Sequence, residues 1–240
     1  MNKNSNIYQI IYAAVMVLIV GTVLALIYMA LKPKQDDNVA NDKRKQILSA
    51  VHITPASDKE IESTFNKYIV SGFLVDENGE IVDSAQNVAF NVDMKNNIKA
   101  AKRQLPVFKC KLDDGSEKYI VPVYGAGLWG PIWGYIAVND NGIDIYGAYF
   151  SHEGETPGLG AEISKPAFQD QFKNKKIYVN DEFKSISVMK AGQTPNDSSE
   201  YVNAITGGTI TSRGVQDMLK KCMTPYDKFF RSLQNNTQTN

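Results

Sequence analysis

The chain has 240 residues, in which 26 lysines and arginines are balanced by 26 aspartates and glutamates. A nucleic-acid partner requires a basic surplus or a basic face, so the balanced charge argues against one. Two cysteines and two histidines are too few and too widely spaced for a disulfide framework or a convincing metal site. Buried free thiols are the default for Cys110 and Cys222, and one long-range disulfide stays open if the domain is exported.

After a short N-terminal tail, residues 1–6, the sequence is almost wholly apolar over residues 7–31. About 25 residues form a helix of roughly 37 Å, which is long enough to cross a bilayer. A cleaved signal peptide would have a shorter apolar core and small residues at its cleavage site, and 29–32 does not fit that pattern. We therefore expect one retained membrane-spanning helix. The flanking lysines do not decide its orientation, and the absence of ionisable residues within it argues against an ion pathway.

The remaining sequence predicts one α+β domain, residues 42–232, joined to the anchor by a polar linker at 32–41. Helices are expected at 42–56 and at 58–69, the second of them capped by Ser57. The helices and hairpins together favour an antiparallel sheet flanked by helices, and the Asn-, Gln- and Thr-rich residues 233–240 are expected to be disordered. The hairpin-like pairs are 71–74 with 81–82, 107–112 with 118–123, 132–138 with 142–150, and 176–179 with 185–189.

The segment 205–213 places glycines and hydroxyls directly before a helical pattern. Thr211 or Ser212 is expected to cap that helix. Free N–H groups at a helix start, followed by Arg213, make a natural phosphate site, although a plain capping turn is the alternative. No Lys-Ser/Thr pair follows Gly208, so this is not a nucleoside-triphosphate loop, and no GxGxxG motif indicates a dinucleotide-binding half.

Two further loops have an unusual composition. Residues 125–134 hold four glycines and both tryptophans of the chain, which suits either close approach of a ligand or a tight structural turn. Residues 152–160 combine carboxylates, a threonine hydroxyl, a proline and glycines. That loop could grip the edge of a planar heterocycle, and a capping turn before 161–165 is the alternative.

These three motifs, GxGLWGxxxG, HxxETPGLG and then [ST]G[AG]Tx[ST]S at the start of a C-terminal helix, resemble the FMN-binding domain of respiratory flavoproteins. With one N-terminal anchor and this length, the sequence is most similar to the C-type subunits of sodium-translocating NADH:quinone reductases. The resemblance covers the anchor and essentially the whole domain after it. It implies FMN attached covalently, through its phosphate, to the hydroxyl of Thr209. The sequence departs from the pattern at Gly208, where alanine is usual, and at Asn203, where aspartate is usual.

The resemblance also implies roles for the loops and for the chain. The protein would be an electron-transfer subunit of a six-subunit complex that couples NADH oxidation and quinone reduction to sodium export, with no catalytic residue or metal ligand of its own. Its domain would lie on the periplasmic side of the cell inner membrane. The FMN contacts implied are Glu155, Thr156, Gly158 and Leu159 on one side, Gly127, Leu128 and Trp129 opposite, and Thr206, Gly207, Gly208, Thr209, Thr211 and Arg213 at the phosphate.

A threonine hydroxyl is a poor nucleophile, and no histidine or cysteine lies near Thr209 in the sequence to activate it. A separate flavin transferase is therefore expected to install the cofactor. Two alternatives remain open at this level. One is the related G-type subunit of the ferredoxin-linked ion-translocating complex, and the other is a non-redox, membrane-anchored binding domain with the same fold.

Overall fold

The structure is a computed structural model, and it describes residues 6–237. The chain divides into a first unit, residues 1–43, and a second unit, residues 44–240. One helix, α1 (Asn6–Ser49), forms the described part of the first unit and contributes its last turns to the second. The second unit contains every strand of the described chain and is the unit that holds the three motifs.

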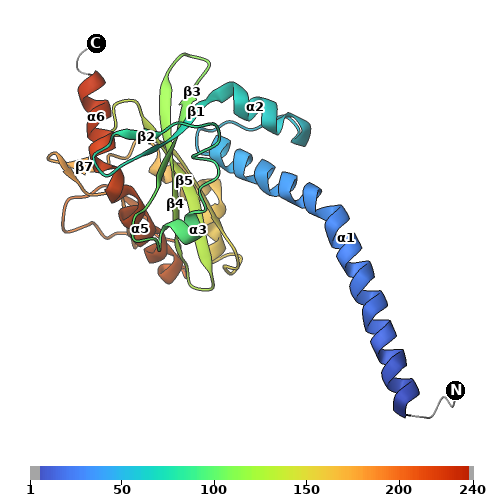
Figure 1. The fold of residues 1–240 in the computed structure, drawn as a ribbon. Coiled ribbons are helices and arrows are strands. Elements are labelled where there is room, and N and C mark those ends of the chain that lie inside the picture. The colour runs from blue at the N-terminus through green and yellow to red at the C-terminus, as the bar shows by residue number, and fades with distance from the viewer. Residues whose placement is uncertain (1–5, 238–240) are drawn as a thin grey trace. The chain divides into compact units, whose positions relative to one another are not determined.

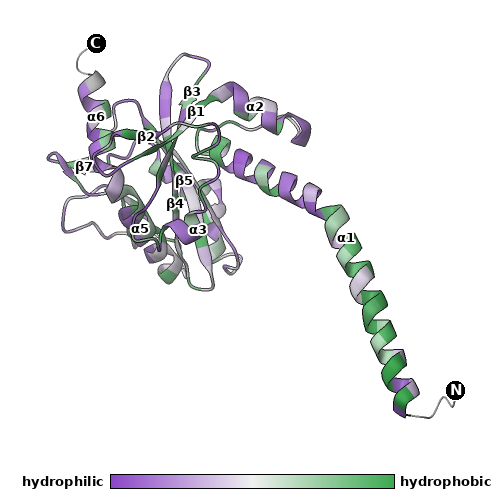
Figure 2. Ribbon diagram, viewed as in Figure 1, coloured by the Kyte–Doolittle hydropathy of each residue, from purple (hydrophilic) through white to green (hydrophobic). Residues whose placement is uncertain are grey.

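Figure 2 shows that α1 begins with an apolar stretch and continues with a more polar one. By length and composition α1 can cross a membrane, and the residues of its most apolar window are not buried within the protein. The predicted span, 7–31, lies inside this helix. Of the predicted N-terminal tail, 1–6, only Asn6 is among the described residues, and α1 begins there.

The segment predicted as a linker, 32–41, is helical and contains Pro33. Proline removes one helical hydrogen bond, but the Lys32 ammonium lies 3.2 Å from Asp36 Oδ1, an i,i+4 ion pair that supports the helix across this point. The separate helix predicted at 42–56 is instead the end of α1, which stops at Ser49. The chain then turns, and His52 adopts a positive φ of 59°.

Six strands of the second unit form one antiparallel sheet in the order β2-β1-β3-β4-β5-β6 (Figure 1). Successive side chains along a strand point to opposite faces, so Val107 and Phe108 enter two different apolar cores. The α+β architecture predicted from the hairpins is confirmed. The strands are β1 (Ile69–Val75), β2 (Ile81–Asp83), β3 (Leu105–Lys111), β4 (Glu117–Ala126), β5 (Pro131–Asn139) and β6 (Ile145–His152).

Helices cover both faces of this sheet. Ile47, in the last turn of α1, and Val51, just after that helix, belong to the core that contains Phe108. Val215 and Phe230, from the two C-terminal helices, belong to the core on the other face. The helices after α1 are η1 (Asp58–Glu60), α2 (Ile61–Tyr68), α3 (Met94–Asn97), η2 (Gly160–Ser164), α4 (Pro166–Gln169), η3 (Asp170–Phe172), α5 (Thr209–Met223), η4 (Thr224–Tyr226) and α6 (Asp227–Thr237).

Three of the four predicted hairpins are confirmed as β1–β2, β3–β4 and β5–β6. The fourth prediction, which paired 176–179 with 185–189, is wrong. The short hairpin there joins β7 (Tyr178–Val179) to β8 (Glu182–Phe183), and β9 (Ser187–Met189) pairs in parallel with β10 (Tyr201–Asn203). The predicted cap at Ser57 is also wrong, because its hydroxyl donates to the Glu60 carboxylate instead of accepting from the helix backbone.

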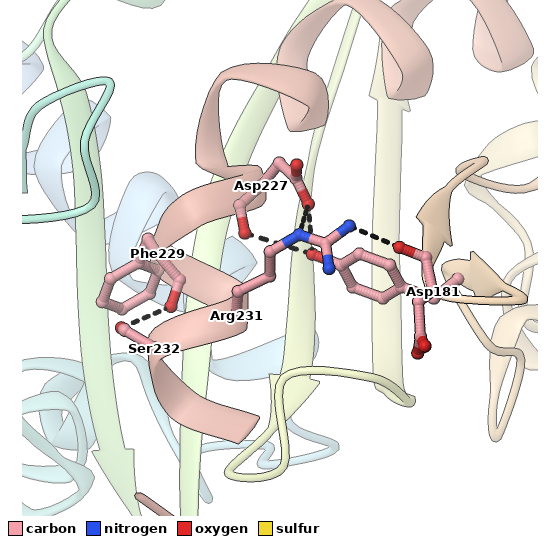
Figure 3. A network of polar contacts seen from close by, with 6 residues as sticks. Asp181, Asp227, Phe229, Arg231 and Ser232 are labelled. Carbon is pink, nitrogen blue, oxygen red and sulfur yellow. Dashed lines mark hydrogen bonds and ion pairs between the residues drawn. The ribbon is translucent and has the colours of Figure 1, made fainter. Parts of the chain in front are cut away.

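The C-terminal residues differ from the prediction of a disordered tail at 233–240. Helix α6 continues through Thr237, and Leu233 is buried, while 238–240 lie outside the described residues. Figure 3 shows how α6 is held: Asp227 accepts hydrogen bonds from Arg231 at 3.0 Å and from the Tyr178 hydroxyl at 2.7 Å. Arg231 also donates to the Asp181 carbonyl, so α6 is tied to the β7–β8 hairpin.

Candidate functional site

The three motifs identified in the sequence converge at one end of the second unit. The first lies in the turn between β4 and β5, the second in the loop between β6 and η2, and the third at the start of α5. Trp129 of the first motif and Thr211 of the third both donate hydrogen bonds to the Glu155 carboxylate of the second. Leu159 of the second motif lies directly beside Gly207 of the third.

Helix α5 begins at Thr209, because the two glycines before it allow the turn that starts the helix. Gly207 has a φ of +76°, and a side chain there would collide with Leu159. Gly208 is the N-cap residue and provides no side-chain hydrogen bond. The first intrahelical bond runs from Ser212 N to Gly208 O, at 2.9 Å. The N–H groups at positions 209–211 therefore precede the first helical donor, Ser212 N, and point out of the helix start.

The predicted capping role of Thr211 or Ser212 is wrong, because the helix starts before them. The Thr211 hydroxyl donates to Glu155 Oε2 at 2.5 Å. The Ser212 hydroxyl accepts from the Ile205 N–H at 3.0 Å. Both hydroxyls are thus used to fix the first turn of α5 against the rest of the domain.

The four hydroxyl residues of the third motif differ in accessibility. Thr211 and Ser212 are each only 1% exposed, whereas Thr206 and Thr209 are exposed. Within residues 6–237, the Thr209 hydroxyl forms no hydrogen bond with another side chain. The side chains of Thr206 and Thr209 are therefore accessible, and Thr209 is the one that lies at the first helical residue.

Large apolar side chains are exposed on all three motifs. Trp129 is 69% exposed and Ile210 58%, and Leu128 and Leu159 are also exposed. Apolar side chains gathered at a surface mark binding sites more often than chance. Leu159 lies beside Gly207, and Ile210 follows Thr209 in α5, so apolar side chains are exposed in the motif that carries the Thr209 hydroxyl. This arrangement suits a planar ring bearing a phosphate.

Two further predicted residues frame the phosphate end. Arg213 is exposed and lies one helical turn after Thr209, on the same face of α5. The positive end of the helix dipole adds to the cation there. Thr156 and Gly158 are exposed in the second loop, where Gly158 N donates to Glu162 Oε1 at 3.1 Å. The hydrogen bond to Glu162 therefore holds the loop, while Thr156 and Gly158 stay accessible to solvent.

Sequence reasoning missed three residues that shape the site. Gly160 leaves room for the Glu155 carboxylate and the Thr211 hydroxyl, which a side chain there would strike. Gly214 lets α5 approach the Ala126 carbonyl at the end of β4. His152 accepts from Glu155 N through its Nδ1, at 3.2 Å. For Gly214 a signal was available, because a glycine inside a helical pattern usually reflects close packing.

Across residues 6–237 no group of three or more His, Cys, Asp or Glu side chains is placed to hold a metal ion. Cys110 and Cys222 are buried and unlinked, as the sequence predicted by default. Burial raises the pKa of the Cys110 thiol to about 11 and also raises the pKa of the Cys222 thiol. Neither thiol is thus available as a thiolate at neutral pH.

The site offers N–H groups at a helix start, which suit a phosphate, and exposed apolar side chains, which suit a flavin ring. Residues 127–224, which include most of the first motif and all of the other two, match the model of the FMN-binding domain family. The fold and the site therefore define a membrane-anchored protein of the FMN-binding class.

Comparison with individual proteins gives a narrower placement. The chain is 30% identical over 217 residues to NqrC, the C-type subunit of the Na(+)-translocating NADH-quinone reductase, of Vibrio alginolyticus, covering 83% of each chain. It is 30% identical over 231 residues to the corresponding subunit of Neisseria meningitidis, covering 90% of this chain and 88% of that one. The chain belongs to the NqrC family.

Solved structures agree with this placement. The crystal structure of the same subunit from Parabacteroides distasonis is 48% identical and superposes with a TM-score of 0.77, covering 83% of this chain and 96% of that one. NqrC of Shewanella oneidensis is 26% identical with a TM-score of 0.67, covering 82% and 98%. The NqrC family, rather than the ferredoxin-linked alternative, is thus confirmed.

Proposed function

We propose that this chain carries FMN covalently, as a phosphoester of Thr209, and relays electrons within a sodium-translocating NADH:quinone reductase. The observation that supports this most directly is the exposed Thr209 hydroxyl at the first residue of α5, between a glycine pair and exposed apolar side chains. Bound FMN supplies the redox chemistry, because no side chain of the protein accepts and returns electrons in this way.

The residues of the chain bind and orient the cofactor. The N–H groups at positions 209–211 and the dipole of α5 stabilise the phosphate, and Arg213 adds a positive charge. Leu128, Trp129 and Leu159 provide apolar contact with the ring, and Thr156, Gly158 and Glu155 shape the loop beside it. The remaining members of the proposed binding set, Gly127, Thr206, Gly207, Gly208 and Thr211, give the backbone room or fix the helix start.

We expect a separate flavin transferase to form the ester. Within the described residues no side chain is hydrogen-bonded to the Thr209 hydroxyl, so no base is in place to take its proton. An ester made through the phosphate leaves the ring unaltered. It also holds the cofactor at high effective concentration, which is useful in a compartment without free FMN.

The attachment is tested by intact mass after expression with and without a flavin transferase. The parent should gain the mass of one FMN residue only when the transferase is present, and Thr209→Ala should gain nothing. Thr206→Ser is the matched control, because Thr206 is also exposed in the same motif and serine keeps the hydroxyl that the motif has at this position; it should be modified like the parent. Equal FMN gain in Thr209→Ala and the parent would contradict the assignment.

The chain alone is not expected to oxidise NADH, since it contains no dinucleotide-binding motif. It functions with the other subunits of a six-subunit complex, and its domain lies on the periplasmic side of the inner membrane. The lysines that flank the anchor do not fix this side, so the proposal rests on the family.

Orientation can be measured directly because both native thiols are buried. A cysteine introduced at exposed Lys173 (Lys173→Cys) should react in intact cells, once the outer membrane is permeabilised, with a maleimide that cannot cross the inner membrane. Labelling that requires lysis of the inner membrane would place the domain in the cytoplasm instead. The parent chain gives the background.

A further inference from the structure

A buried carboxylate joins the three motifs. Glu155 is 4% exposed, and both of its carboxylate oxygens accept hydrogen bonds. Oε1 accepts from the backbone N–H of Trp129 at 2.8 Å, and Oε2 accepts from the Thr211 hydroxyl at 2.5 Å. The donors come from the β4–β5 turn and from the first turn of α5, which are far apart in the sequence. Hydrogen bonds to a charged acceptor are stronger than those between neutral groups.

The surroundings of this carboxylate are shaped for it. A Cβ atom on Gly127 or on Gly160 would collide with the carboxylate oxygens. Gly127 also closes the β4–β5 turn through a hydrogen bond from its N–H to the Gly130 carbonyl, at 2.8 Å. Two missing side chains thus make the space in which the carboxylate reaches both donors. The Thr211 hydroxyl lies two residues after Thr209, and Thr211 is itself 1% exposed.

We infer that Glu155 is a positioning residue, which holds the Trp129 turn and the first turn of α5 in one fixed arrangement. Its consequence for the cofactor rests on the proposed function. The apolar side chain of Trp129 and the ester-bearing Thr209 then keep a constant separation, so the attached flavin ring is held in one position. Glu155 acts through Trp129 and Thr211. The same bond keeps the Thr211 hydroxyl occupied and buried, so of the two threonine hydroxyls in the first turn of α5 only that of Thr209 is accessible.

Three variants separate this role from simple packing. Glu155→Gln keeps both contacts, because its amide oxygen can accept from Trp129 N and its amide nitrogen can donate to the Thr211 oxygen. Glu155→Ala removes both contacts. Thr211→Val removes the hydroxyl but keeps the side-chain shape, so it tests the hydrogen bond between Thr211 and Glu155 even if Glu155→Ala folds poorly. Glu153→Ala is the matched control, since Glu153 is exposed and lies in the same loop.

The first measurement needs no flavin. Amide hydrogen exchange of the full chain, expressed without a transferase, should be about tenfold faster at Trp129 in Glu155→Ala, because a backbone donor has lost its acceptor. Exchange at Ser212 N, which donates to the Gly208 carbonyl at the start of α5, should rise in both Glu155→Ala and Thr211→Val. Glu155→Gln and Glu153→Ala should match the parent. Parent-like exchange in both Glu155→Ala and Thr211→Val would overturn the inference, and so would equal acceleration in Glu155→Gln and Glu155→Ala.

The second measurement uses the flavinylated protein, after intact mass has shown FMN on Thr209. Time-resolved anisotropy of the flavin emission should show one slow component in the parent, in Glu155→Gln and in Glu153→Ala. Glu155→Ala and Thr211→Val should gain a fast component from a ring that moves on its tether. An immobile ring in both of these variants overturns the positioning role. A parent without FMN on Thr209 would instead refute the proposed function. The exchange measurement would still show whether Glu155 holds the Trp129 turn and the first turn of α5 together.

Discussion

At the scale of single residues, Gly160 shows how the site depends on an absent side chain. A methyl group there would strike the Glu155 carboxylate and the Thr211 hydroxyl, both buried. Overpacking of this kind costs about 1–3 kcal/mol. We therefore expect Gly160→Ala to lower the free energy of unfolding by that amount, measured by urea denaturation of the detergent-solubilised chain.

Gly154→Ala is the control for this prediction. It lies in the same loop, and a Cβ atom there would meet nothing within 4 Å. Its free energy of unfolding should stay within about 0.5 kcal/mol of the parent. If Gly160→Ala were as stable as Gly154→Ala, the tight packing around Glu155 would not exist in solution.

The two cysteines give a second prediction for single residues. Both are buried, and burial raises the pKa of each thiol, to about 11 for Cys110. Because the thiolate is the reactive species, neither thiol should react with iodoacetamide at pH 8 in the folded protein. Both should react after unfolding in urea, as counted by mass. Rapid modification of either cysteine before unfolding would contradict the buried, unlinked state.

At the scale of elements, α6 is the clearest departure from the sequence prediction. Its last turns were expected to be disordered because Asn, Gln and Thr are poor markers of a packed helix. One apolar residue, Leu233, decides otherwise, since it is buried in the same core as Phe230. Tertiary packing here overrides composition, and a single apolar residue in a polar segment gives too weak a periodic signal to be recognised.

Truncating that side chain tests the helix. Leu233→Ala should destabilise the protein by about 2–5 kcal/mol, the usual cost of removing a buried leucine side chain. Ser232→Ala, at an exposed neighbour, should change stability by about 0.5 kcal/mol or less. Thermal or urea unfolding followed by circular dichroism measures both. Equal stability of the two variants would show that Leu233 is not packed in the core and that residues 233–237 form a disordered tail.

The strand pairings show the same division between local and distant information. The β1–β2, β3–β4 and β5–β6 hairpins were predictable because short Asp-, Asn- and Gly-rich turns join their strands. The pairing of β9 with β10 is parallel and spans a longer loop, 190–200, so no short hairpin turn marks it in the sequence. In the site, likewise, the motifs marked Thr209 and the glycines, but the bond between Glu155 and Thr211 joins residues 56 positions apart. No local pattern predicts such a contact.

At the scale of the whole molecule, the described chain is an anchor helix followed by one domain whose two cores lie on opposite faces of a single sheet. Several groups that are neutral when protonated are buried in that domain. Burial raises the pKa of Cys110 and Cys222, and it raises the pKa of Tyr226 well above its usual value. These groups link the stability of the domain to alkaline pH.

The sign follows from the direction of these shifts. In the unfolded chain the thiols and phenols lose their protons near pH 9 to 10, whereas in the folded state they stay protonated to higher pH. The folded state therefore binds more protons above about pH 9. Its stability is fully present below that pH and falls as the pH rises, by about 1.4 kcal/mol per pH unit for each group ionised only in the unfolded state.

Tyr226→Phe isolates one of these groups. The Tyr226 hydroxyl donates to the Pro106 carbonyl at 2.9 Å in the core, so the variant should lose about 1 kcal/mol at pH 8. Because phenylalanine cannot ionise, its free energy of unfolding should then fall less steeply than that of the parent between about pH 10 and pH 11. The two curves of stability against pH should converge. Curves that stay parallel would show that Tyr226 does not couple folding to proton binding.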